Sequence, residues 1–247
     1  MKHPVYTIDI NADLGEGTGF DVQLMPLISS CSIACGGHFG TEETMRTTVQ
    51  LAKQYGVKVG AHPSYPDRKN FGRKVIEITK QDLEESIVNQ LQSFYEVCAS
   101  EEVTVHHIKL HGALYNYAGI DPTTADAVLT AVQEKEKQVK LYLQHGSVLH
   151  EKAEQVIPLA FEAFIDRSYQ EDGSLVPRSQ PQALIETPEK AWKQLYSMVS
   201  RGVVRCLNEK EIPLEASTFC IHGDHQNSVA ILNYIHQQCK RHFIQVI

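Results

Sequence analysis

The chain has 247 residues, of which 42% are hydrophobic and 21% charged, and it carries a net charge of −7 with a pI near 5.9. These values are ordinary for one globular domain and exclude a disordered or collagen-like chain. No run of lysine or arginine suggests nucleic-acid binding, and no stretch reaches the roughly 18 apolar residues that a membrane span requires. We therefore expect a single domain over residues 1–247, located in the cytoplasm, with neither nucleic acid nor membrane as a partner. The six cysteines are scattered without a C-x-x-C pair, which favours buried structural thiols.

Short apolar runs alternate with longer amphipathic runs along the chain, which predicts strands alternating with helices. The clearest helix is Lys80–Ser100, whose apolar residues recur at steps of three and four. Strand and helix in alternation predict a parallel sheet covered by helices, and seven or eight such units fit a single-domain α/β fold, the (β/α) barrel. The expected strands are Tyr6–Ile10, Ser32–Ala34, Val57–Ala61, His107–Leu110, Leu141–Leu143, Leu159–Phe161, Thr218–Ile221 and Phe243–Ile247. Further helices are expected to begin near Thr41, at Pro122 and at Pro188, and one is expected from Gln226 to Lys240.

Polar, ionisable or glycine residues follow nearly every expected strand. In a parallel barrel these strand ends meet on one face, which is where barrel enzymes place their chemistry. Turn formation explains glycine and aspartate at such positions, but it does not require histidine. The pattern therefore predicts an active site at this face. Four histidines follow strands in this way: His62, His111, His145 and His222.

Asp9, Asn11 and Asp13 alternate along the first expected strand, so they share one of its faces. A carboxylate that faces the inside of a barrel is costly unless it is paired or used as an acid, a base or a metal ligand. Asp9 is interpreted either as a structural hydrogen-bond acceptor or as a functional group. Asp13, nearer the strand end, is the better catalytic candidate.

Gly36 and Gly37 lie in a turn before an expected helix. Glycines in such a turn let backbone N–H groups approach an anion at the helix N-terminus. Gly-rich turns are common, however, and the chain has no phosphate-loop motif of the G-x-x-x-x-G-K-[ST] type. This turn is therefore weak evidence by itself.

Lys109 stands between His107 and His111 on one face of an expected strand. Its positive charge argues against a zinc triad and suits the binding of a carboxylate or a phosphate. The H-x-x-x-H spacing still leaves a metal site open.

Two long loops follow strands, at residues 63–79 and 168–186, and could fold over the barrel mouth. They carry Tyr65, Arg73 and Arg178, and the arginines there could bind carboxylate or phosphate oxygens through two hydrogen bonds each. From spacing alone, ordinary solvated arginines are the better explanation.

A series of motifs then appears in a fixed order along nearly the whole chain. The motifs occupy residues 9–17, 33–38, 60–67, 71–73, 109–116, 166–169, 175–178 and 221–224. Together they resemble the LamB/YcsF family. The resemblance implies a β/α barrel similar to that of the polysaccharide deacetylases.

The resemblance also implies a function, the cleavage of 5-oxo-L-proline (pyroglutamate) to L-glutamate coupled to the hydrolysis of ATP. The lactam is a stable amide, and phosphorylation of its carbonyl oxygen would activate it before water attacks. ATP, with Mg²⁺, is then the co-substrate, and two further subunits, B and C, are the expected partners. No tightly bound metal is expected, and zinc is the alternative.

Strand-end position and motif match together define the site hypothesis. The catalytic residues, for proton transfer and for stabilising the developing oxyanion, are Asp13, His62, Lys109 and His111. The residues expected to bind substrate or phosphate are Asn11, Glu16, Gly36, Gly37, His38, Tyr65, Arg73, Asn116, Asp166, Arg167, Arg178, His222 and Asp224.

Two alternatives stay open at this point. The first is a metal-dependent deacetylase of acylated sugars, with a divalent ion held by groups such as Asp13, His38 and His62. The second is a binding subunit that presents pyroglutamate to catalytic partners and performs no chemistry.

Overall fold

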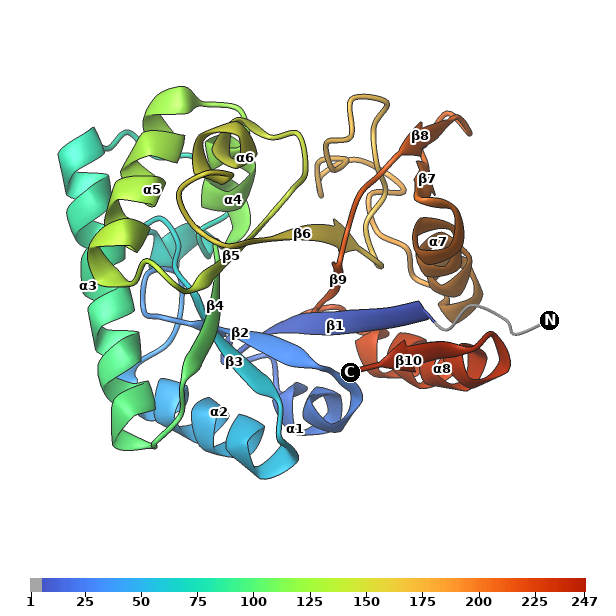
Figure 1. Cartoon of the computed structure of the whole chain (residues 1–247), viewed down its shortest axis with the longest axis horizontal. Coiled ribbons are helices and arrows are strands. Elements are labelled where there is room, and N and C mark those ends of the chain that lie inside the picture. The colour runs from blue at the N-terminus through green and yellow to red at the C-terminus, as the bar shows by residue number, and fades with distance from the viewer. Residues whose placement is uncertain (1–5) are drawn as a thin grey trace.

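The computed structural model describes residues 6–247, and at its centre seven parallel strands close into a barrel (Figure 1). Strand β9 pairs with β6 on one side and with β1 on the other, which closes the ring. An eighth parallel strand, β10 (Ile244–Val246), pairs with the beginning of β1. The expected β/α barrel is therefore confirmed. Around the ring the strands are β1 (Tyr6–Leu14), β2 (Ser30–Ala34), β3 (Lys58–His62), β4 (Val105–Lys109), β5 (Lys140–Leu143), β6 (Leu159–Phe164) and β9 (Thr218–His222).

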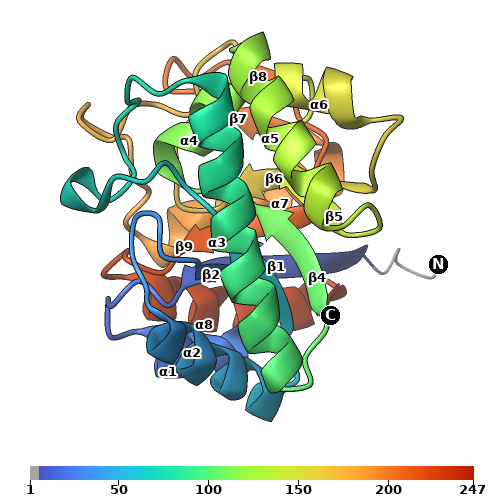
Figure 2. The same ribbon diagram turned by 90° about the vertical axis from the view of Figure 1, so that its left-hand side faces the viewer.

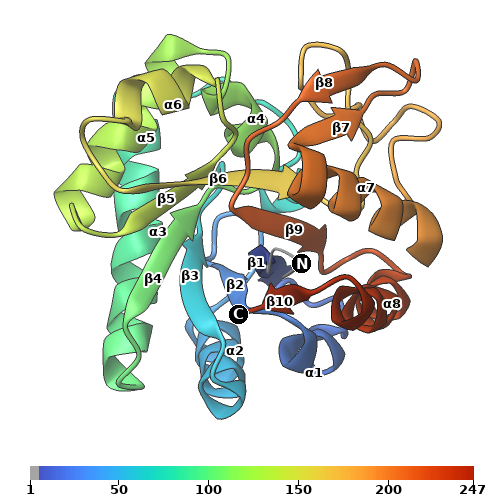
Figure 3. The same ribbon diagram turned by 45° about the vertical axis from the view of Figure 1, so that its right-hand side comes forward.

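Helices surround the barrel, with the long helix α3 in front in Figure 2 and α7 and α8 at the right in Figure 3. Between β6 and β9 the chain adds an antiparallel ribbon, which the sequence did not predict. The helices are α1 (Asp21–Leu24), α2 (Glu42–Tyr55), α3 (Lys80–Ser100), α4 (Gly112–Ala118), α5 (Pro122–Lys135), α6 (Val148–Ala153), α7 (Pro188–Arg201) and α8 (Ser228–Arg241). Two short 3-10 turns are η1 (Met25–Leu27) and η2 (Arg68–Asn70), and the ribbon is formed by β7 (Val203–Arg205) and β8 (Glu211–Pro213).

The predicted starts of α2, α3, α5 and α7 are confirmed, and side-chain capping explains the first three. The side chain of Thr79 accepts a hydrogen bond from the third residue of α3, and Asp121 caps α5 in the same way ahead of Pro122. Thr41 and Thr44 form reciprocal capping hydrogen bonds at the start of α2. Helix α8 begins two residues later than expected, because Gln226 belongs to the turn after β9.

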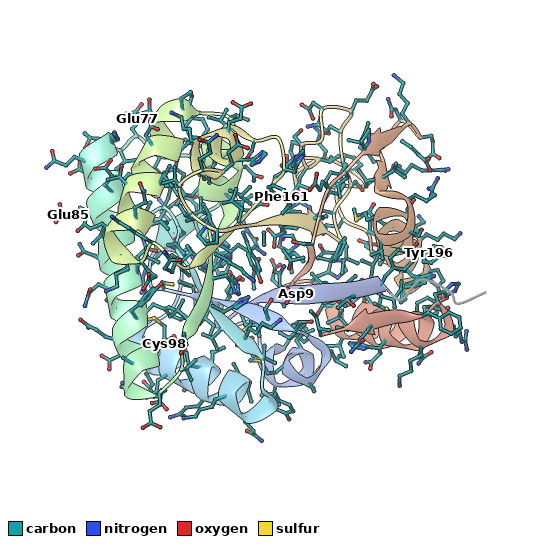
Figure 4. The ribbon with its side chains drawn as sticks, viewed as in Figure 1. Asp9, Glu77, Glu85, Cys98, Phe161 and Tyr196 are labelled. Atoms are coloured by element: carbon teal, nitrogen blue, oxygen red, sulfur yellow. The ribbon has the colours of Figure 1, made fainter. Side chains whose placement is uncertain are left out.

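The hydrophobic core lies between the barrel and the helices. In α3 the predicted apolar stripe, which includes Leu83, Ile87 and Leu91, is fully buried. The inner face of the barrel is polar instead, as Asp9 on β1 indicates near the middle of Figure 4. The fold therefore places an apolar layer around a column of polar side chains.

The strands extend further than their apolar runs. Strand β1 continues four residues beyond Ile10, because Asn11 and Asp13 stay in register with both β2 and β9. His62 and His222 are the last residues of β3 and β9 and not the first residues after them. Several of the predicted site residues are therefore held by barrel strands.

Two other expectations concern the whole chain. All six cysteines are buried free thiols, as predicted. Within residues 6–247, none of the helices combines the length and the apolar character that a membrane crossing demands.

Candidate active site

The polar column begins at the amino ends of the strands. There Asp9 accepts hydrogen bonds of 2.7 Å from the hydroxyls of Ser30 and Thr218, and Lys58 Nζ lies 3.6 Å from its other oxygen. Both hydrogen bonds go to Oδ2 and hold the carboxylate in the barrel wall, which supports the structural interpretation of Asp9.

Above this layer the imidazole of His107 crosses the barrel interior. It stacks on Tyr142 with ring centroids 4.0 Å apart, and its Nε2 lies 3.1 Å from the Ser32 hydroxyl. A Cβ atom at Gly60 would overlap this ring, so glycine at that position makes room for it. Burial holds the pKa of His107 well below its usual value, so the ring is neutral.

Lys109 forms the centre of the column. Its ammonium group lies 2.8 Å from carboxylate oxygens of both Asp13 and Glu162, 3.1 Å from Asn11 Oδ1 and 3.0 Å from Cys220 Sγ. Four acceptors thus surround a group that has three N–H donors. The contacts to Asn11 and Cys220 are hydrogen bonds and those to Asp13 and Glu162 are ion pairs, so the buried ammonium holds its neighbours in place.

Asp13 links Lys109 to the histidines nearer the barrel mouth. Its Oδ2 lies 3.5 Å from His62 Nε2, and the residue is 5% exposed. Burial by itself would raise the pKa of Asp13, but the charges of His62 and Lys109 lower it well below its usual value. The same carboxylate raises the pKa of His62 against the effect of burial. Asp13 is therefore ionised.

Glu16, His38, His62 and His111 form a buried cluster, which we call the histidine cluster. One carboxylate oxygen, Glu16 Oε1, lies 2.9 Å from His38 Nε2, 3.2 Å from His111 Nδ1 and 3.9 Å from His62 Nε2. His62 Nε2 and His111 Nδ1 lie 3.1 Å apart, and the rings of His38 and His111 stack with centroids 3.6 Å apart. Burial lowers the pKa of His38 to about 4 and that of His111 below its usual value.

Backbone carbonyls orient two of these rings. His62 Nδ1 donates to the carbonyl oxygen of Lys109 at 2.8 Å, and His111 Nε2 donates to that of Phe71 at 2.9 Å. Because a carbonyl oxygen can only accept, these hydrogen bonds place a proton on the outer nitrogen of each ring. The inner nitrogens then face Glu16 and each other.

His222 and Asp166 form a second ionisable pair at the barrel mouth. His222 Nδ1 lies 3.0 and 3.1 Å from the two oxygens of Asp166, and the Asp166 carboxylate also accepts from the His222 backbone N–H. Burial opposes ionisation of Asp166, but His222 lowers its pKa below the usual value. His222 stacks on Phe164, and Nε2 is the ring nitrogen left for a ligand. Across β1 and β9, His222 is the register partner of Asp13.

An arginine pair flanks Asp224 at the same mouth. Arg73 forms an ion pair with Asp224 Oδ2, and Arg178 Nη1 lies 3.1 Å from the same oxygen. The two guanidinium groups come from the two loops that the sequence placed over the mouth, and both stay partly exposed. Two cations around one carboxylate leave a positive charge for an anionic ligand.

The structure places other predicted residues away from these groups. Arg167 is buried and donates to the carbonyls of Val176 and Ala183, so it holds the loop that carries Arg178. Tyr65 is buried and shares a hydrogen bond with Thr124.

The remaining predicted positions have other surroundings. Asn116 is exposed and donates to the Gly112 carbonyl within α4. The turn at Gly36 is held by Arg68, which donates to the Gly36 carbonyl at 3.1 Å. A Cβ at Gly37 would overlap the side chain of Gln90. His145 also follows a strand but lies on the surface, 3.6 Å from Glu215.

Sequence reasoning missed Glu162, Cys220 and the carbonyl of Phe71. Glu162 is 2% exposed and interrupts the apolar run of β6, and this lone charge was the signal that could have revealed it. Cys220 lies in an apolar strand and gave no such signal. A backbone carbonyl has no signature in the sequence at all.

A closed parallel barrel with ionisable side chains gathered at the carboxyl ends of its strands has the architecture of a β/α-barrel enzyme. The chain belongs to the LamB/YcsF family, whose profile matches residues 8–247. It is 38% identical, over 97% of its length and 98% of theirs, to the 5-oxoprolinase A subunits of two Haemophilus influenzae strains, PittEE and 86-028NP. It also superimposes on the crystal structure of a lactam utilization protein from Thermus thermophilus. That match has a TM-score of 0.90 and 34% identity and covers 97% of this chain and 98% of the other.

Proposed function

We propose that this protein is the A subunit of a 5-oxoprolinase. It binds 5-oxo-L-proline at the barrel mouth and opens the lactam ring to give L-glutamate, as part of a cytoplasmic assembly with subunits B and C. The assembly uses ATP, with Mg²⁺, as co-substrate. The family match over residues 8–247 and the names of the similar proteins support the substrate class.

The observation that carries the proposal is the juxtaposition of the His222–Asp166 pair with Asp13, at a mouth that also holds two arginines. Lactam cleavage requires a group that moves protons and a site for an anionic substrate. The Nδ1 hydrogen bond to Asp166 fixes His222 so that its Nε2 can accept and donate a proton. Arg73 and Arg178 supply the cations for the substrate carboxylate or for phosphate.

The reaction balances as 5-oxoproline, ATP and two waters giving glutamate, ADP and phosphate. Transfer of the terminal phosphoryl group to the lactam oxygen makes C5 electrophilic. Water then adds to C5 and loses a proton, and the C5–N bond breaks as the ring nitrogen gains one. The acyl phosphate that remains is hydrolysed by the second water. We assign the proton transfers at C5 and at the ring nitrogen to His222 Nε2.

These roles revise part of the hypothesis made from the sequence, in which Lys109 took part in proton transfer. Because its ammonium already has four protein acceptors, we assign Lys109 the task of holding Asp13 and Glu162 ionised and in place. Lys109 is then a positioning residue.

The test is reconstitution with the cognate B and C subunits. Glutamate release and ADP formation are measured from 5-oxoproline and ATP, with each component omitted in turn. We expect equal amounts of both products only in the complete mixture. Glutamate release that does not depend on this chain, with competent partners, would refute the proposal. Turnover by His222→Gln at the wild-type rate would show that His222 is not the group that transfers protons.

The histidine cluster favours a second candidate, a metal-dependent hydrolase of acylated sugars, because Glu16, His62 and His111 could together hold a metal ion. Acetate release from N-acetylated chito-oligosaccharides by the isolated chain, without ATP or partners, would identify this activity. Absence of acetate release together with ATP-dependent glutamate release would exclude it.

A further inference from the structure

We propose that Glu16, His62 and His111 bind one divalent transition-metal ion inside the barrel mouth. The sequence led us to expect no tightly bound metal, with zinc as the alternative, and this proposal takes up the alternative. The inference concerns these three side chains and does not depend on the identity of the substrate.

The spacing of the three inner atoms fits a metal ion. Glu16 Oε1, His62 Nε2 and His111 Nδ1 are separated by 3.1, 3.2 and 3.9 Å. A triangle with these sides has a circumscribed radius of about 2.0 Å, which equals the Zn–N and Zn–O bond lengths of about 2.0–2.2 Å. One ion can therefore reach all three atoms without any of them moving.

The hydrogen bonds of the two imidazoles also favour metal binding. Both outer N–H groups are donated to backbone carbonyls, those of Lys109 and Phe71. Metal-bound histidines characteristically donate their second N–H to a carbonyl or a carboxylate, which fixes the tautomer and the direction of the ring. The two inner nitrogens and the Glu16 oxygen then face one another across a gap that one ion could fill.

A cation would also balance the buried charges. Asp13, Glu16 and Glu162 are three carboxylates, each 5% exposed or less, and Lys109 is the ammonium in direct contact with two of them. These four residues together carry two negative charges, which a divalent ion would neutralise. Uncompensated charge of this size is expensive inside a protein.

Lys109 does not stand against the proposal, although its charge argued against a metal when only the sequence was considered. Its ammonium contacts Asp13, Glu162 and Asn11, and its backbone carbonyl accepts from the outer nitrogen of His62. The carboxylate of Asp13 lies beside the proposed ion site, with Oδ2 3.5 Å from His62 Nε2.

Two imidazoles and one carboxylate select the chemical class of the ion. Mg²⁺ and Ca²⁺ prefer oxygen ligands throughout, whereas imidazole suits zinc, iron, cobalt and nickel. Three protein ligands leave coordination positions for water or substrate. A bound ion of this kind supplies Lewis-acid polarisation of a carbonyl or lowers the pKa of a bound water.

The experiment measures binding directly. The untagged full-length chain is stripped with a chelator and titrated with Co²⁺, whose visible absorption reports imidazole and carboxylate coordination, and Zn²⁺ is then used in competition. We expect one ion per chain. Glu16→Gln and His111→Asn should each weaken Co²⁺ binding about 100-fold or more, since even residues that only orient a ligand contribute 10- to 100-fold. His145→Asn, at a surface histidine beside a glutamate, is the matched control and should bind normally.

Circular dichroism of the metal-free variants checks that they fold. If the variants do not fold, X-ray absorption of the Zn²⁺-loaded wild-type chain identifies the ligands instead. We expect two imidazole nitrogens at about 2.0 Å from the zinc ion. The inference is overturned if the wild-type chain takes up no stoichiometric ion, or if His145→Asn and not Glu16→Gln abolishes uptake. Metal content is read separately from glutamate release, so failure of one proposal is distinguishable from failure of the other.

Discussion

His222 and Asp166 are joined at the barrel mouth by a side-chain hydrogen bond of 3.0 Å, and the same carboxylate accepts the backbone N–H of His222. The aspartate thereby fixes both the position of β9 at its last residue and the tautomer of the ring. Nε2 is left as the nitrogen that can exchange a proton with a ligand.

Removing this imidazole should therefore abolish most of the turnover. We expect His222→Gln to lower kcat for glutamate release by about 10²- to 10⁴-fold, the usual contribution of a general acid or base. Asp166→Asn should also lower kcat, because the ring is then free to adopt the other tautomer. Steady-state kinetics of the reconstituted complex measure both changes. His236→Gln, which removes a ring bound to the Leu27 carbonyl elsewhere in the fold, should leave kcat unchanged. Equal losses in all three variants would indicate a structural effect alone.

The charge of Lys109 should be needed for folding stability. Lys109→Met leaves the buried carboxylates of Asp13 and Glu162 without their cation, which typically costs about 3–5 kcal/mol. Adding Glu162→Gln should restore part of the loss, because one of the two uncompensated charges is then removed. Urea unfolding of the isolated chain measures the free energy of unfolding of each variant. Lys58→Met is the matched control, since its ammonium is more exposed and 3.6 Å from its carboxylate, and it should cost about 1 kcal/mol or less.

The two arginines at the mouth should act on substrate binding. Arg178→Gln removes charge-assisted hydrogen bonds worth about 1.5–3 kcal/mol, so KM for 5-oxoproline or for ATP should rise about 10- to 150-fold with a small change in kcat. Arg73→Gln should also raise KM for the same substrate. The substrate whose KM rises identifies the anion that the pair binds. A fall in kcat with KM unchanged would show that the arginines do not bind the ground-state substrate.

His107 should make the stability of the protein depend on pH. Burial lowers its pKa in the folded state, so below the unfolded pKa of about 6.5 the unfolded chain binds more protons than the folded one. The contribution of His107 is therefore complete above pH 6.5 and is lost as the pH falls toward the folded pKa, by up to about 1.4 kcal/mol per pH unit. Unfolding free energies between pH 7.5 and 5.0 should fall less steeply for His107→Asn than for the wild-type chain. Parallel slopes would contradict the assignment.

Much of the fold could be predicted because local signals and packing agree. The apolar stripe of α3 and the proline starts of α5 and α7 depend on neighbours in the sequence, and the structure confirms all three. The end of β1 was placed too early, because polar residues such as Asn11 are normally evidence against a buried strand. Their partners come from β4, β6 and β9, which are far away in the sequence.

The site itself was only partly accessible from the sequence. Strand-end position correctly brought Asp13, His62 and His111 together, because the carboxyl ends of parallel strands share one face. Arg167 follows a strand equally well, yet its side chain turns into its own loop. Sequence position gives the face of the barrel on which a residue lies, and the direction of a long side chain is decided by acceptors that the sequence does not identify.

The carbonyl groups that orient His62 and His111 have an evolutionary consequence. A main-chain oxygen is present whatever side chain its residue carries, so a substitution at residue 71 that tolerates the φ of 54° changes the Phe71 ring and keeps the acceptor. The orientation of the two imidazoles therefore depends little on which side chains the residues with these carbonyls carry. The changes able to disturb it are insertions and deletions that shift the path of residues 63–79, and a side chain at Gly72, whose Cβ would lie 2.9 Å from His111 Cδ2. Within this family, a loop of this length that keeps glycine at the position of Gly72 should mark a working centre.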